Sequence, residues 1–401
     1  MSAEMKGLPQ MNDLRLGVTG FGRRSKMAAL AHRPGDGSRI ELVFDPAEGS
    51  RRAASERLGP ETRTTATFED LLASDLDAVF VTSPDHQHES QAVALLEAGK
   101  AVFLEKPMSS TLAGADRILN AAASSGSKLY VGHNMRHMPF VQEMKRIIDS
   151  GRIGEVKTIW CRHYVGQGGE FFYRDWHADR RNVTSLLVQK AVHDIDIIHW
   201  LAGGYSQRVH AYGDLVLYGA LTDRQPPGAD EEFEPWYQES DGRWRATWPP
   251  ESLTGLYPVT DVEDLSMMHM QLNNGVLASY QECNFSPDYW RNYVVIGTHG
   301  KIENIGNGDP LARIEIWDRR HRWWAEPDEV VPVPPREGGH FGADPMMVAE
   351  FLDFVRFGTR PSTSPVSARW AVAAGYCATM SLRDAGDSVD VPPLPPGTEH
   401  L

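Results

Sequence analysis

The chain has 401 residues, of which 41% are hydrophobic, and this length favours two domains over a single hydrophobic core. Its formal net charge of −14 argues against nucleic acids and anionic membranes as partners, because both attract basic surfaces. We therefore expect a small-molecule partner, with no nucleic acid and no membrane. The three cysteines, Cys161, Cys283 and Cys377, follow no disulfide or CxxC pattern, which fits a reducing cytoplasm.

The first part of the chain has the pattern of a parallel sheet. Residues 1–13 hold no apolar segment of signal-peptide length, and we expect a flexible leader there. Short apolar runs at 14–19, 40–44, 78–82, 101–104 and 128–131 then alternate with helical stretches such as 91–98 and 113–124. This alternation predicts βαβ units, and we assign residues 14–135 to a first domain.

The remainder, residues 136–401, has a different pattern and is assigned to a second α/β domain. Its runs are longer and richer in β-branched and aromatic residues: 157–165, 207–218, 262–279, 289–298 and 313–322. Such runs are typical of a mostly antiparallel sheet with one solvated face. Two helices are expected near 345–357 and 366–384. No run in the chain approaches the eighteen or so apolar residues of a membrane span.

Residues 221–257 stand apart within this second domain. They combine several prolines with an acidic run and with Trp236, Trp244 and Trp248. A surface insertion between two strands explains this composition. The alternative is a lid or a subunit contact, because long irregular loops are often functional.

A glycine-rich turn follows the first apolar run, where Gly20, Phe21 and Gly22 lead into a helix. Glycines at such a turn let the backbone approach a pyrophosphate, whose charge meets the helix N-terminus. Ser25 stands where a third glycine is usual, so the helix and strand must accommodate a hydroxyl. The turn therefore predicts a dinucleotide site.

The identity of the dinucleotide depends on Asp45, which ends the second apolar run 25 residues after Gly20. A carboxylate at this spacing binds the adenine ribose, and it favours NAD over NADP because it repels a 2′-phosphate. Arg23 and Arg24 leave NADP open, since either could accommodate that phosphate.

Two further strand ends carry polar residues. The first is followed by small residues and a histidine that can border a nicotinamide ribose: Thr82, Ser83, Pro84 and His88. A plain strand-to-helix turn with a capping residue explains this segment equally well. The second end carries Glu105, Lys106 and Pro107. Open α/β sheets bind ligands at the carboxyl ends of their strands, so we expect Glu105 and Lys106 at the cofactor site.

A polar stripe interrupts the apolar segment 189–200. Residues three and four apart share one face of a helix, so we expect four side chains to point into one pocket: Gln189, Lys190, His193 and Asp196. A solvated face with charge pairs is the alternative. The His193 and Asp196 spacing also fits a metal pair, but no further ligand cluster accompanies it, and we predict no metal site.

The segment 173–181 interleaves basic and aromatic residues just before this stripe. Arg174 and Arg180 could clamp an anionic group while Trp176 and His177 contact a sugar ring. The alternative is that its arginines and aspartates pair with one another on a surface loop.

Together these motifs resemble the Gfo/Idh/MocA oxidoreductases over residues 14–384. The resemblance rests on Gly20-Phe21-Gly22, Glu105-Lys106-Pro107, Asn134-Met135-Arg136, His193 with Asp196, and Gly297-Thr298-His299-Gly300, in this order. It implies a Rossmann domain that binds the cofactor, with Asn134 among its contacts. It also implies a second α/β domain whose open sheet forms subunit contacts, hence a homo-oligomer, either a dimer or a tetramer. A sugar or cyclitol would lie between the domains.

We therefore predict an NAD-dependent oxidoreductase that transfers a hydride between a secondary alcohol and nicotinamide. His193 would be the general base and Lys106 would polarise the hydroxyl oxygen, or Lys106 would be the base and His193 would hold the hydroxyl. Many members of the family carry an aspartate four residues before the histidine. This chain has Gln189 there, and an amide cannot buffer a proton.

Two other functions use similar residues. One is an NAD-dependent glycosidase that oxidises a sugar ring transiently, eliminates the aglycone and reduces the ring again. The other is a redox sensor without catalysis, although a sensor would not need the Lys106 and His193 pair.

Overall fold

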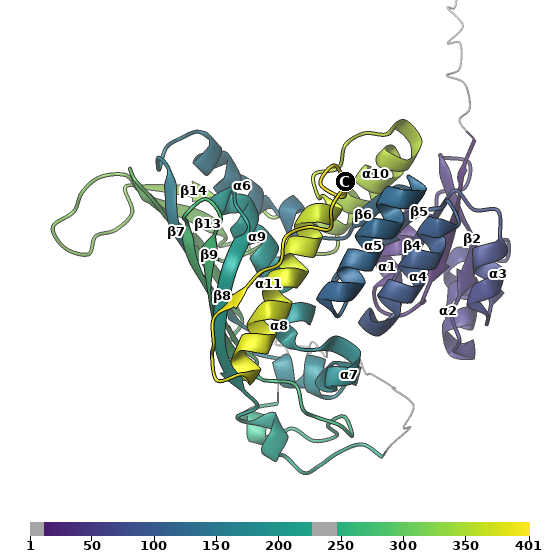
Figure 1. Ribbon diagram of the computed structural model, residues 1–401, viewed down its shortest axis with the longest axis horizontal. Coiled ribbons are helices and arrows are strands. Elements are labelled where there is room, and N and C mark those ends of the chain that lie inside the picture. Colours follow the sequence, from purple (N-terminus) through teal and green to yellow (C-terminus); the bar gives the residue numbers. More distant parts are fainter. Residues whose placement is uncertain (1–11, 227–246) are drawn as a thin grey trace, which may run out of the picture.

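The computed structural model describes residues 12–226 and 247–401. In this part of the chain a six-stranded sheet lies at one end and a nine-stranded sheet at the other, with helices between them (Figure 1). Among these residues, every helix is too short or too polar to cross a membrane.

The first sheet is parallel throughout, in the order β3-β2-β1-β4-β5-β6. Its strands are β1 (Leu14–Thr19), β2 (Ser38–Phe44), β3 (Arg63–Thr65), β4 (Ala78–Val81), β5 (Ala101–Leu104) and β6 (Leu129–Val131). All residues of β4 and β5 are buried, as expected of strands covered on both faces. The chain order reverses between β1 and β4, and a crevice for a ligand opens at such a point in doubly wound sheets. The predicted parallel sheet is confirmed.

Four regular helices connect these strands: α2 (Glu48–Leu58), α3 (Phe68–Ala73), α4 (Asp85–Glu97) and α5 (Leu112–Ser125). The helix α5 shows how the sequence defines its ends. The Thr111 side chain accepts a hydrogen bond from the Gly114 amide, and Gly126 follows in the left-handed conformation that favours glycine. The helix after the glycine turn, α1 (Ser25–Ala28), has only four residues.

A helix from the end of the chain completes the first domain. α10 (Ala343–Phe357) packs on the first sheet, where Phe351 contacts the rings of Phe80, Phe103 and Tyr130 at centroid distances of 5.1, 5.4 and 5.8 Å. All four rings are fully buried. The chain therefore returns to the first sheet after the strands of the second, and the division at residue 135 stays a prediction.

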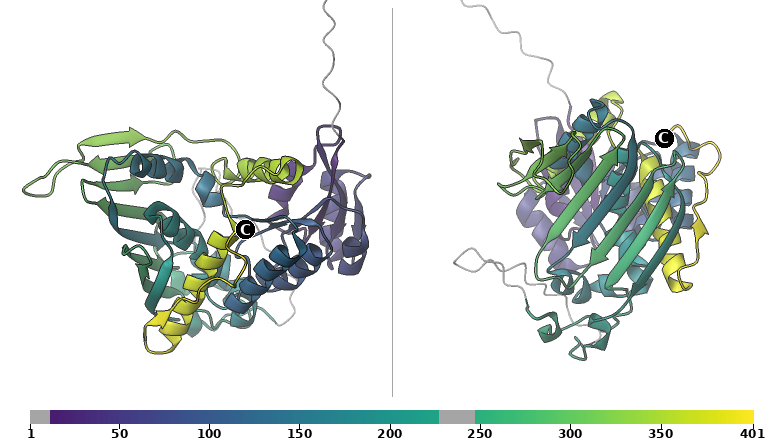
Figure 2. Two further views of the ribbon diagram at one scale, coloured as in Figure 1. Left: turned by 45° about the horizontal axis from the view of Figure 1, so that its top comes forward. Right: turned by 90° about the vertical axis from the view of Figure 1, so that its left-hand side faces the viewer.

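The second sheet has the order β14-β13-β12-β11-β7-β10-β9-β8-β15. Its strands are β7 (Val156–Tyr164), β8 (Ser206–Asp214), β9 (Leu265–Leu272), β10 (Leu277–Cys283), β11 (Trp290–Gly297), β12 (Lys301–Ile305), β13 (Arg313–Trp317), β14 (Glu329–Pro332) and β15 (Val389–Asp390). Neighbours are antiparallel except β7 and β10. Among the described residues, no helix covers one face of this sheet (Figure 2). The predicted open, mostly antiparallel sheet is confirmed, although the run 262–279 forms two strands joined at Gly275 (φ 85°).

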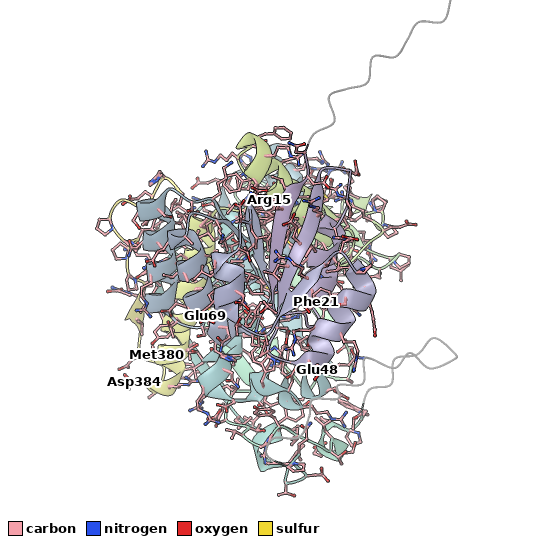
Figure 3. The ribbon with its side chains drawn as sticks, turned by 90° about the vertical axis from the view of Figure 1, so that its right-hand side faces the viewer. Arg15, Phe21, Glu48, Glu69, Met380 and Asp384 are labelled. Carbon is pink, nitrogen blue, oxygen red and sulfur yellow. The ribbon has the colours of Figure 1, made fainter. Side chains whose placement is uncertain are left out.

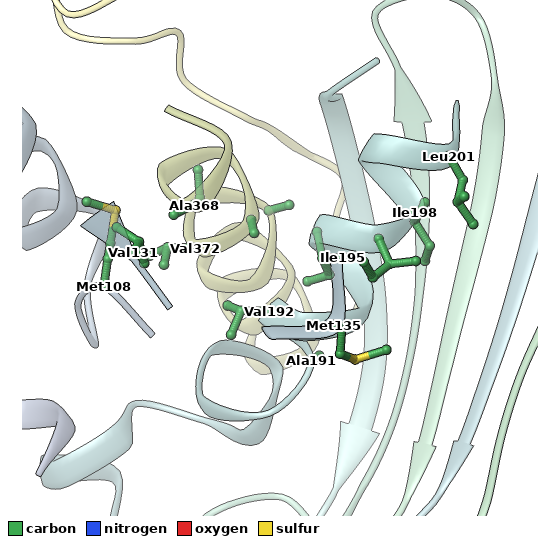
Figure 4. Close-up of a cluster of buried hydrophobic side chains, with 14 of the residues drawn as sticks. Met108, Val131, Met135, Ala191, Val192, Ile195, Ile198, Leu201, Ala368 and Val372 are labelled. Carbon is green, nitrogen blue, oxygen red and sulfur yellow. The ribbon is translucent and has the colours of Figure 1, made fainter. Parts of the chain in front are cut away.

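Helices cover the other face and join the two domains. They are α6 (Pro139–Asp149), α7 (Arg180–Val183), α8 (Leu186–Gln189), α9 (Val192–Ala202) and α11 (Pro365–Arg383). In Figure 4, Ala368 and Val372 of α11 lie between Val131 of the first domain and Ile195 of α9. One continuous apolar core therefore spans both domains, and it holds the site between them in place.

The predicted insertion at 221–257 leaves the sheet between β8 and β9. Residues 227–246, with Trp236 and Trp244, lie outside the described residues. The two flanks are joined, because the Gln225 amide donates a hydrogen bond to the Leu256 carbonyl at 2.7 Å. Trp248 is 54% exposed. A role as a lid or a subunit contact stays a prediction.

Candidate functional site

The glycine turn lies where the first sheet reverses its strand order. Figure 3 shows Arg15 and Phe21 at opposite ends of β1, and the turn is at the carboxyl end with Phe21. Gly20 has φ 78°, and a Cβ there would lie 2.6 Å from the Ser83 Cα at the end of β4. Glycine is therefore required. A Cβ at Gly22 would meet no heavy atom of the described residues within 4 Å.

The carboxylate of Asp45 is held against this turn. The Phe21 amide donates to Asp45 Oδ2 at 2.7 Å, and the Ala47 amide donates to Oδ1 at 2.8 Å. The hydroxyl of Ser25 is satisfied locally, because it donates to the Gly22 carbonyl at 2.5 Å. The turn, its carboxylate and the open backbone at Gly22 fit a dinucleotide whose pyrophosphate lies against the turn. The helix after the turn, α1, is followed directly by a 3₁₀ helix at Ala29–Ala31.

The end of β4 is tied to the same turn. Thr82 Oγ1 donates to the Gly20 carbonyl at 2.6 Å, and Ser83 Oγ donates to Gln91 Oε1 at 2.8 Å. Pro84 precedes the first residue of α4. His88 is buried, with Nδ1 2.7 Å from the Pro107 carbonyl oxygen and Nε2 2.9 Å from that of Ser83. Both ring nitrogens of His88 therefore lie within hydrogen-bond distance of main-chain carbonyls just after β4 and β5. A direct contact between the His88 ring and the cofactor stays a prediction.

Glu105 and Lys106 follow β5 beside this crevice. Arg24 donates to Glu105 Oε1 from Nε at 2.9 Å and Nη2 at 2.5 Å, and its Nη1 also reaches Asp344 at 3.2 Å. Lys106 extends toward the second domain, where Nζ donates to the Gln189 carbonyl at 3.0 Å. Burial lowers the pKa of Lys106, and the negative charges of Asp85 and Glu105 oppose that shift. The Lys106-Pro107 peptide is cis.

The predicted single helix at 189–200 is wrong, because the chain forms α8 and α9 with Lys190 and Ala191 between them. The break leaves the Gln189 carbonyl free of the second helix, and Lys106 binds it. His193, in the first turn of α9, is 9% exposed, and its Nδ1 has no hydrogen-bond partner among the described residues. Burial and the cations Lys106 and Lys190 hold the pKa of His193 well below its usual range. The imidazole is therefore neutral near pH 7.

One of the four predicted pocket residues, Asp196, is paired with an arginine. Asp196 is 1% exposed and is bound by Arg136, which donates from Nε at 2.8 Å and Nη2 at 2.6 Å. This bidentate pair anchors the 3₁₀ helix Asn134–His137 to α9. Asn134 itself is buried, and its Oδ1 has no partner among the described residues. Asp196 therefore has a structural partner, and substrate binding by Asp196 stays a prediction.

A buried charge cluster that the sequence analysis missed includes Asp194, the residue directly after His193. Arg291 Nε lies 3.1 Å from Asp194 Oδ1, and His163 Nδ1 lies 3.3 Å from Asp194 Oδ2. Glu282 is 1% exposed, and neither carboxyl oxygen has a partner among the described residues. Burial raises the pKa of Glu282 to about 8, while burial and neighbouring cations lower that of Lys190 to about 7. The available signal was a carboxylate at a core-facing position of the alternation Ala278, Tyr280, Glu282.

The fold and site geometry match a known family. Residues 14–133 match the model of the oxidoreductase family with an NAD-binding Rossmann fold, and residues 141–303 match the GFO/IDH/MocA C-terminal domain. The chain belongs to the GFO/IDH/MocA family. The predicted family, fold class and oxidoreductase activity are confirmed, and the description of the matched Rossmann model supports a nicotinamide cofactor.

Curated GFO/IDH/MocA relatives match different lengths of the chain. The oxidoreductase YteT of Bacillus subtilis (strain 168) is 28% identical over 335 residues, which cover 73% of this chain and 76% of that protein. Inositol 2-dehydrogenase 1 of Saccharopolyspora erythraea is 35% identical over 175 residues, 43% of this chain and 49% of that enzyme. The chain thus spans about half the length of the inositol dehydrogenase that it matches.

Solved GFO/IDH/MocA structures share the whole fold. Levoglucosan dehydrogenase in complex with NADH and levoglucosan has a TM-score of 0.74 at 19% identity, covering 95% of this chain and 100% of that one. Myo-inositol 2-dehydrogenase from Lactobacillus plantarum has a TM-score of 0.69 at 18% identity, with coverage of 95% and 100%. At these identities the likeness shows the fold.

The remaining predicted residues occupy the segment before α8. Arg23 lies 3.5 Å from Asp175, and His177 Nδ1 lies 3.5 Å from the same carboxyl oxygen. Trp176 stacks on His177 at a centroid distance of 3.8 Å. Two arginines have partners beyond this segment: Arg174 donates to the Thr254 carbonyl at 2.8 Å, and Arg180 donates to Glu263 at 3.0 Å. Their contact with a substrate stays a prediction. No group of three or more His, Cys, Asp or Glu residues in the described ranges is arranged to hold a metal ion.

Proposed function

We propose that the chain is an NAD-dependent dehydrogenase that oxidises a secondary alcohol of a sugar or cyclitol. The observation that carries this proposal is the hydrogen bond from Lys106 to the Gln189 carbonyl, which joins the end of β5 to the segment just before His193 across the domain boundary. The relatives include enzymes named as inositol 2-dehydrogenases and as levoglucosan dehydrogenase, which supports a polyhydroxylated ring as substrate. When bound, nicotinamide supplies the hydride acceptor.

The two titratable groups divide the remaining work. Burial, together with the positive charges of Lys106 and Lys190, lowers the pKa of His193, so we assign its neutral ring to orient the substrate hydroxyl. Lys106 has a lowered pKa and is the group that takes the hydroxyl proton. This assignment chooses the second of the two schemes that the sequence left open. In Lys106→Met, the limb of the pH profile that this lysine governs should vanish, whereas in His193→Asn it should persist at lower kcat. The reverse pattern would restore His193 as the base.

The cofactor preference is proposed to be NAD. Asp45 lies against the Phe21 amide, where it would receive a ribose hydroxyl and repel a phosphate. The Arg24 guanidinium forms ion pairs with Glu105 and Asp344. The Arg23 guanidinium lies near Asp175. Isothermal titration should give a lower Kd for NADH than for NADPH. In Asp45→Ala the ratio of these two Kd values should move closer to one. Equal affinities in the unchanged protein would contradict this preference.

The substrate is tested with a panel of inositols, pyranosides and sugar acids. NADH formation and released aglycone are measured in the same reactions. NADH should accumulate with at least one cyclitol or sugar and without aglycone release. Aglycone release without net NADH would identify the glycosidase instead, an alternative that the dehydrogenase names of the relatives do not favour.

We also propose that the open sheet face mediates self-association. Large hydrophobic side chains on it remain exposed, among them Tyr212 (61%), Leu277 (59%), Trp160 (50%) and Met267 (45%). Apolar groups gathered on one face of a folded protein commonly mark an interface. Light scattering after gel filtration should give a dimer or tetramer, and Leu277→Glu should lower its mass. A monomer in the unchanged protein would contradict self-association.

A further inference from the structure

His133 is a buried histidine whose ring nitrogens are both without a hydrogen bond. It lies two residues after β6 and is 2% exposed. Among the described residues, neither its Nδ1 nor its Nε2 has a hydrogen-bond partner. The buried ring of His88 differs, because both of its nitrogens lie within hydrogen-bond distance of main-chain carbonyls. Buried polar groups are rarely left unpaired, since the loss of hydration is costly, so His133 needs a reason for its place.

The end of β6 brings His133 to the same edge of the sheet as Lys106. Leu104 of β5 pairs with Val131 of β6, and the Gly132 amide donates to the Leu104 carbonyl at 2.8 Å. The pairing therefore continues past the end of β6. Lys106 and His133 each lie two residues beyond the paired Leu104 and Val131. His133 thus follows its strand where doubly wound sheets bind their ligands.

Two side chains of α9 contact the His133 ring from the second domain. The His193 ring lies edge to face with it, with the ring centroids 6.4 Å apart and the planes at 71°. Asp196 Oδ2 lies 3.5 Å from His133 Nδ1. The same carboxylate is held in place by the bidentate hydrogen bonds from Arg136. His133 therefore lies across the domain boundary from His193 and in direct contact with it.

Packing alone does not explain a histidine at this position. A phenylalanine would fill a similar volume against His193 without placing two unpaired nitrogens in the interior. A ligand that hydrogen-bonds to the ring would remove the cost of burying them. The imidazole is therefore better explained by binding than by packing.

The Asp196 carboxylate favours one tautomer of the His133 ring. Burial lowers the pKa of His133, against the opposing charge of Asp196, so the ring is neutral near pH 7. A neutral imidazole has one N–H donor and one acceptor nitrogen. The negative charge beside Nδ1 favours the proton on that atom, which leaves Nε2 as the acceptor. Such an acceptor suits a ligand hydroxyl.

We propose that His133 is a substrate-binding residue whose Nε2 accepts a hydrogen bond from a ring hydroxyl other than the one that is oxidised. This inference rests on the proposed function for the class of ligand, a sugar or cyclitol. In that function Lys106 and His193 take the hydroxyl at the reacting carbon, so the neighbouring ring of His133 receives a different one. His133 would thereby select among polyhydroxylated rings by the position of this second hydroxyl.

The test compares the substrate found in the panel with analogues that each lack one hydroxyl. In the unchanged protein, loss of the hydroxyl that His133 binds should lower kcat/KM by about tenfold, the equivalent of one hydrogen bond. In His133→Phe, which keeps an aromatic ring against His193, KM for the full substrate should rise by about tenfold with a smaller change in kcat. The same analogue and the full substrate should then have kcat/KM values within about twofold of each other.

Two further variants sharpen this comparison. His133→Gln retains a hydrogen-bond acceptor, so it should recover part of the discrimination that His133→Phe loses, and it serves in place of that variant if the phenylalanine folds poorly. His199→Phe is the matched control, because His199 is also 2% exposed and lies on α9, but its Nε2 is 2.8 Å from Ser206 Oγ. Its discrimination should equal that of the unchanged protein.

Two kinetic outcomes would overturn the inference. In the first, His133→Phe discriminates among all analogues as the unchanged protein does. In the second, His133→Phe loses kcat to the same extent with every analogue, which would mean that the His133 ring only packs against His193.

The tautomer of His133 provides a readout that does not depend on turnover. Long-range ¹H–¹⁵N correlations are recorded on the full chain labelled with ¹⁵N-histidine, and the His133 signals are assigned by their absence from His133→Phe. The proton should reside on Nδ1, with Nε2 unprotonated. A proton on Nε2 would also overturn the inference, because the ring would then offer a donor.

The outcomes separate this inference from the proposed function. If no sugar or cyclitol in the panel is oxidised, the proposed function fails, while the tautomer still decides whether His133 offers an acceptor. If a substrate is oxidised and His133→Phe keeps full discrimination, the proposed function stands and the role of His133 fails.

Discussion

Replacing Gly20 by alanine should destabilise the protein by an amount that the geometry sets. The new Cβ would lie 2.6 Å from Ser83 Cα and 2.7 Å from Ser83 N, both main-chain atoms at the end of β4. A left-handed conformation costs an alanine about 1–2 kcal/mol, and forcing the neighbouring backbone aside costs about 1–3 kcal/mol. We expect a loss of about 2–5 kcal/mol, or about 2–6 °C in Tm if the whole chain unfolds as one unit.

Gly22→Ala is the matched control, because its Cβ would meet nothing within 4 Å. Its stability should stay within about 0.5 kcal/mol of the unchanged protein. Its affinity for NADH should nevertheless fall by about tenfold or more, because the methyl group would occupy the space left for the pyrophosphate. Differential scanning calorimetry and isothermal titration measure the two quantities. A Gly20→Ala protein with an unchanged Tm would refute the close approach, and unchanged NADH affinity in Gly22→Ala would refute the placement of the pyrophosphate.

Three further changes probe the site between the domains. Lys106→Met should lower kcat by about 10²–10⁴-fold and leave the NADH Kd unchanged, and normal turnover with an unshifted pH profile would contradict its role. Arg136→Met should lower the free energy of unfolding in urea by about 3–5 kcal/mol, because it leaves the buried Asp196 carboxylate without its cation. A decrease below about 1 kcal/mol would mean that the Arg136–Asp196 pair is not formed. The pKa of Glu282 is raised from its ordinary 4.5 to about 8 in the folded protein. Protonation of Glu282 therefore stabilises the folded state fully below pH 4.5, and this stabilisation is lost as the pH rises through about 8. Relative to Glu282→Gln, the free energy of unfolding of the unchanged protein should therefore fall by up to about 5 kcal/mol between these two pH values. The difference in Tm between the two proteins should grow over the same range, and a constant difference would contradict a buried, protonated Glu282.

The sequence was sufficient for those parts of the site that lie directly after a strand. Gly20, Asp45, Thr82 and Lys106 all follow apolar runs, and parallel pairing brings such ends to one edge of the sheet. The alternation of strands and helices indicates parallel pairing, and parallel pairing was enough to predict that these residues lie at the same edge of the sheet.

Other features depend on tertiary packing that no local pattern records. No glycine or proline marks the break between α8 and α9, so an unbroken helix was expected across Lys190. The alternation of β10 placed Glu282 on its core-facing side, but it did not record that Asp194 and Arg291 from other elements lie near this carboxylate.

The return of α10 to the first sheet has a consequence for how the chain is made. During synthesis the six strands of the cofactor domain emerge first, but the aromatic surface formed by Phe80, Phe103 and Tyr130 stays uncovered until Phe351 has left the ribosome. Domains ordinarily fold in the order in which they are translated. In this chain the nucleotide-binding domain is completed only after the second domain has been translated. A nascent chain that stops before residue 343 therefore carries an incomplete first domain with an exposed aromatic surface that can aggregate.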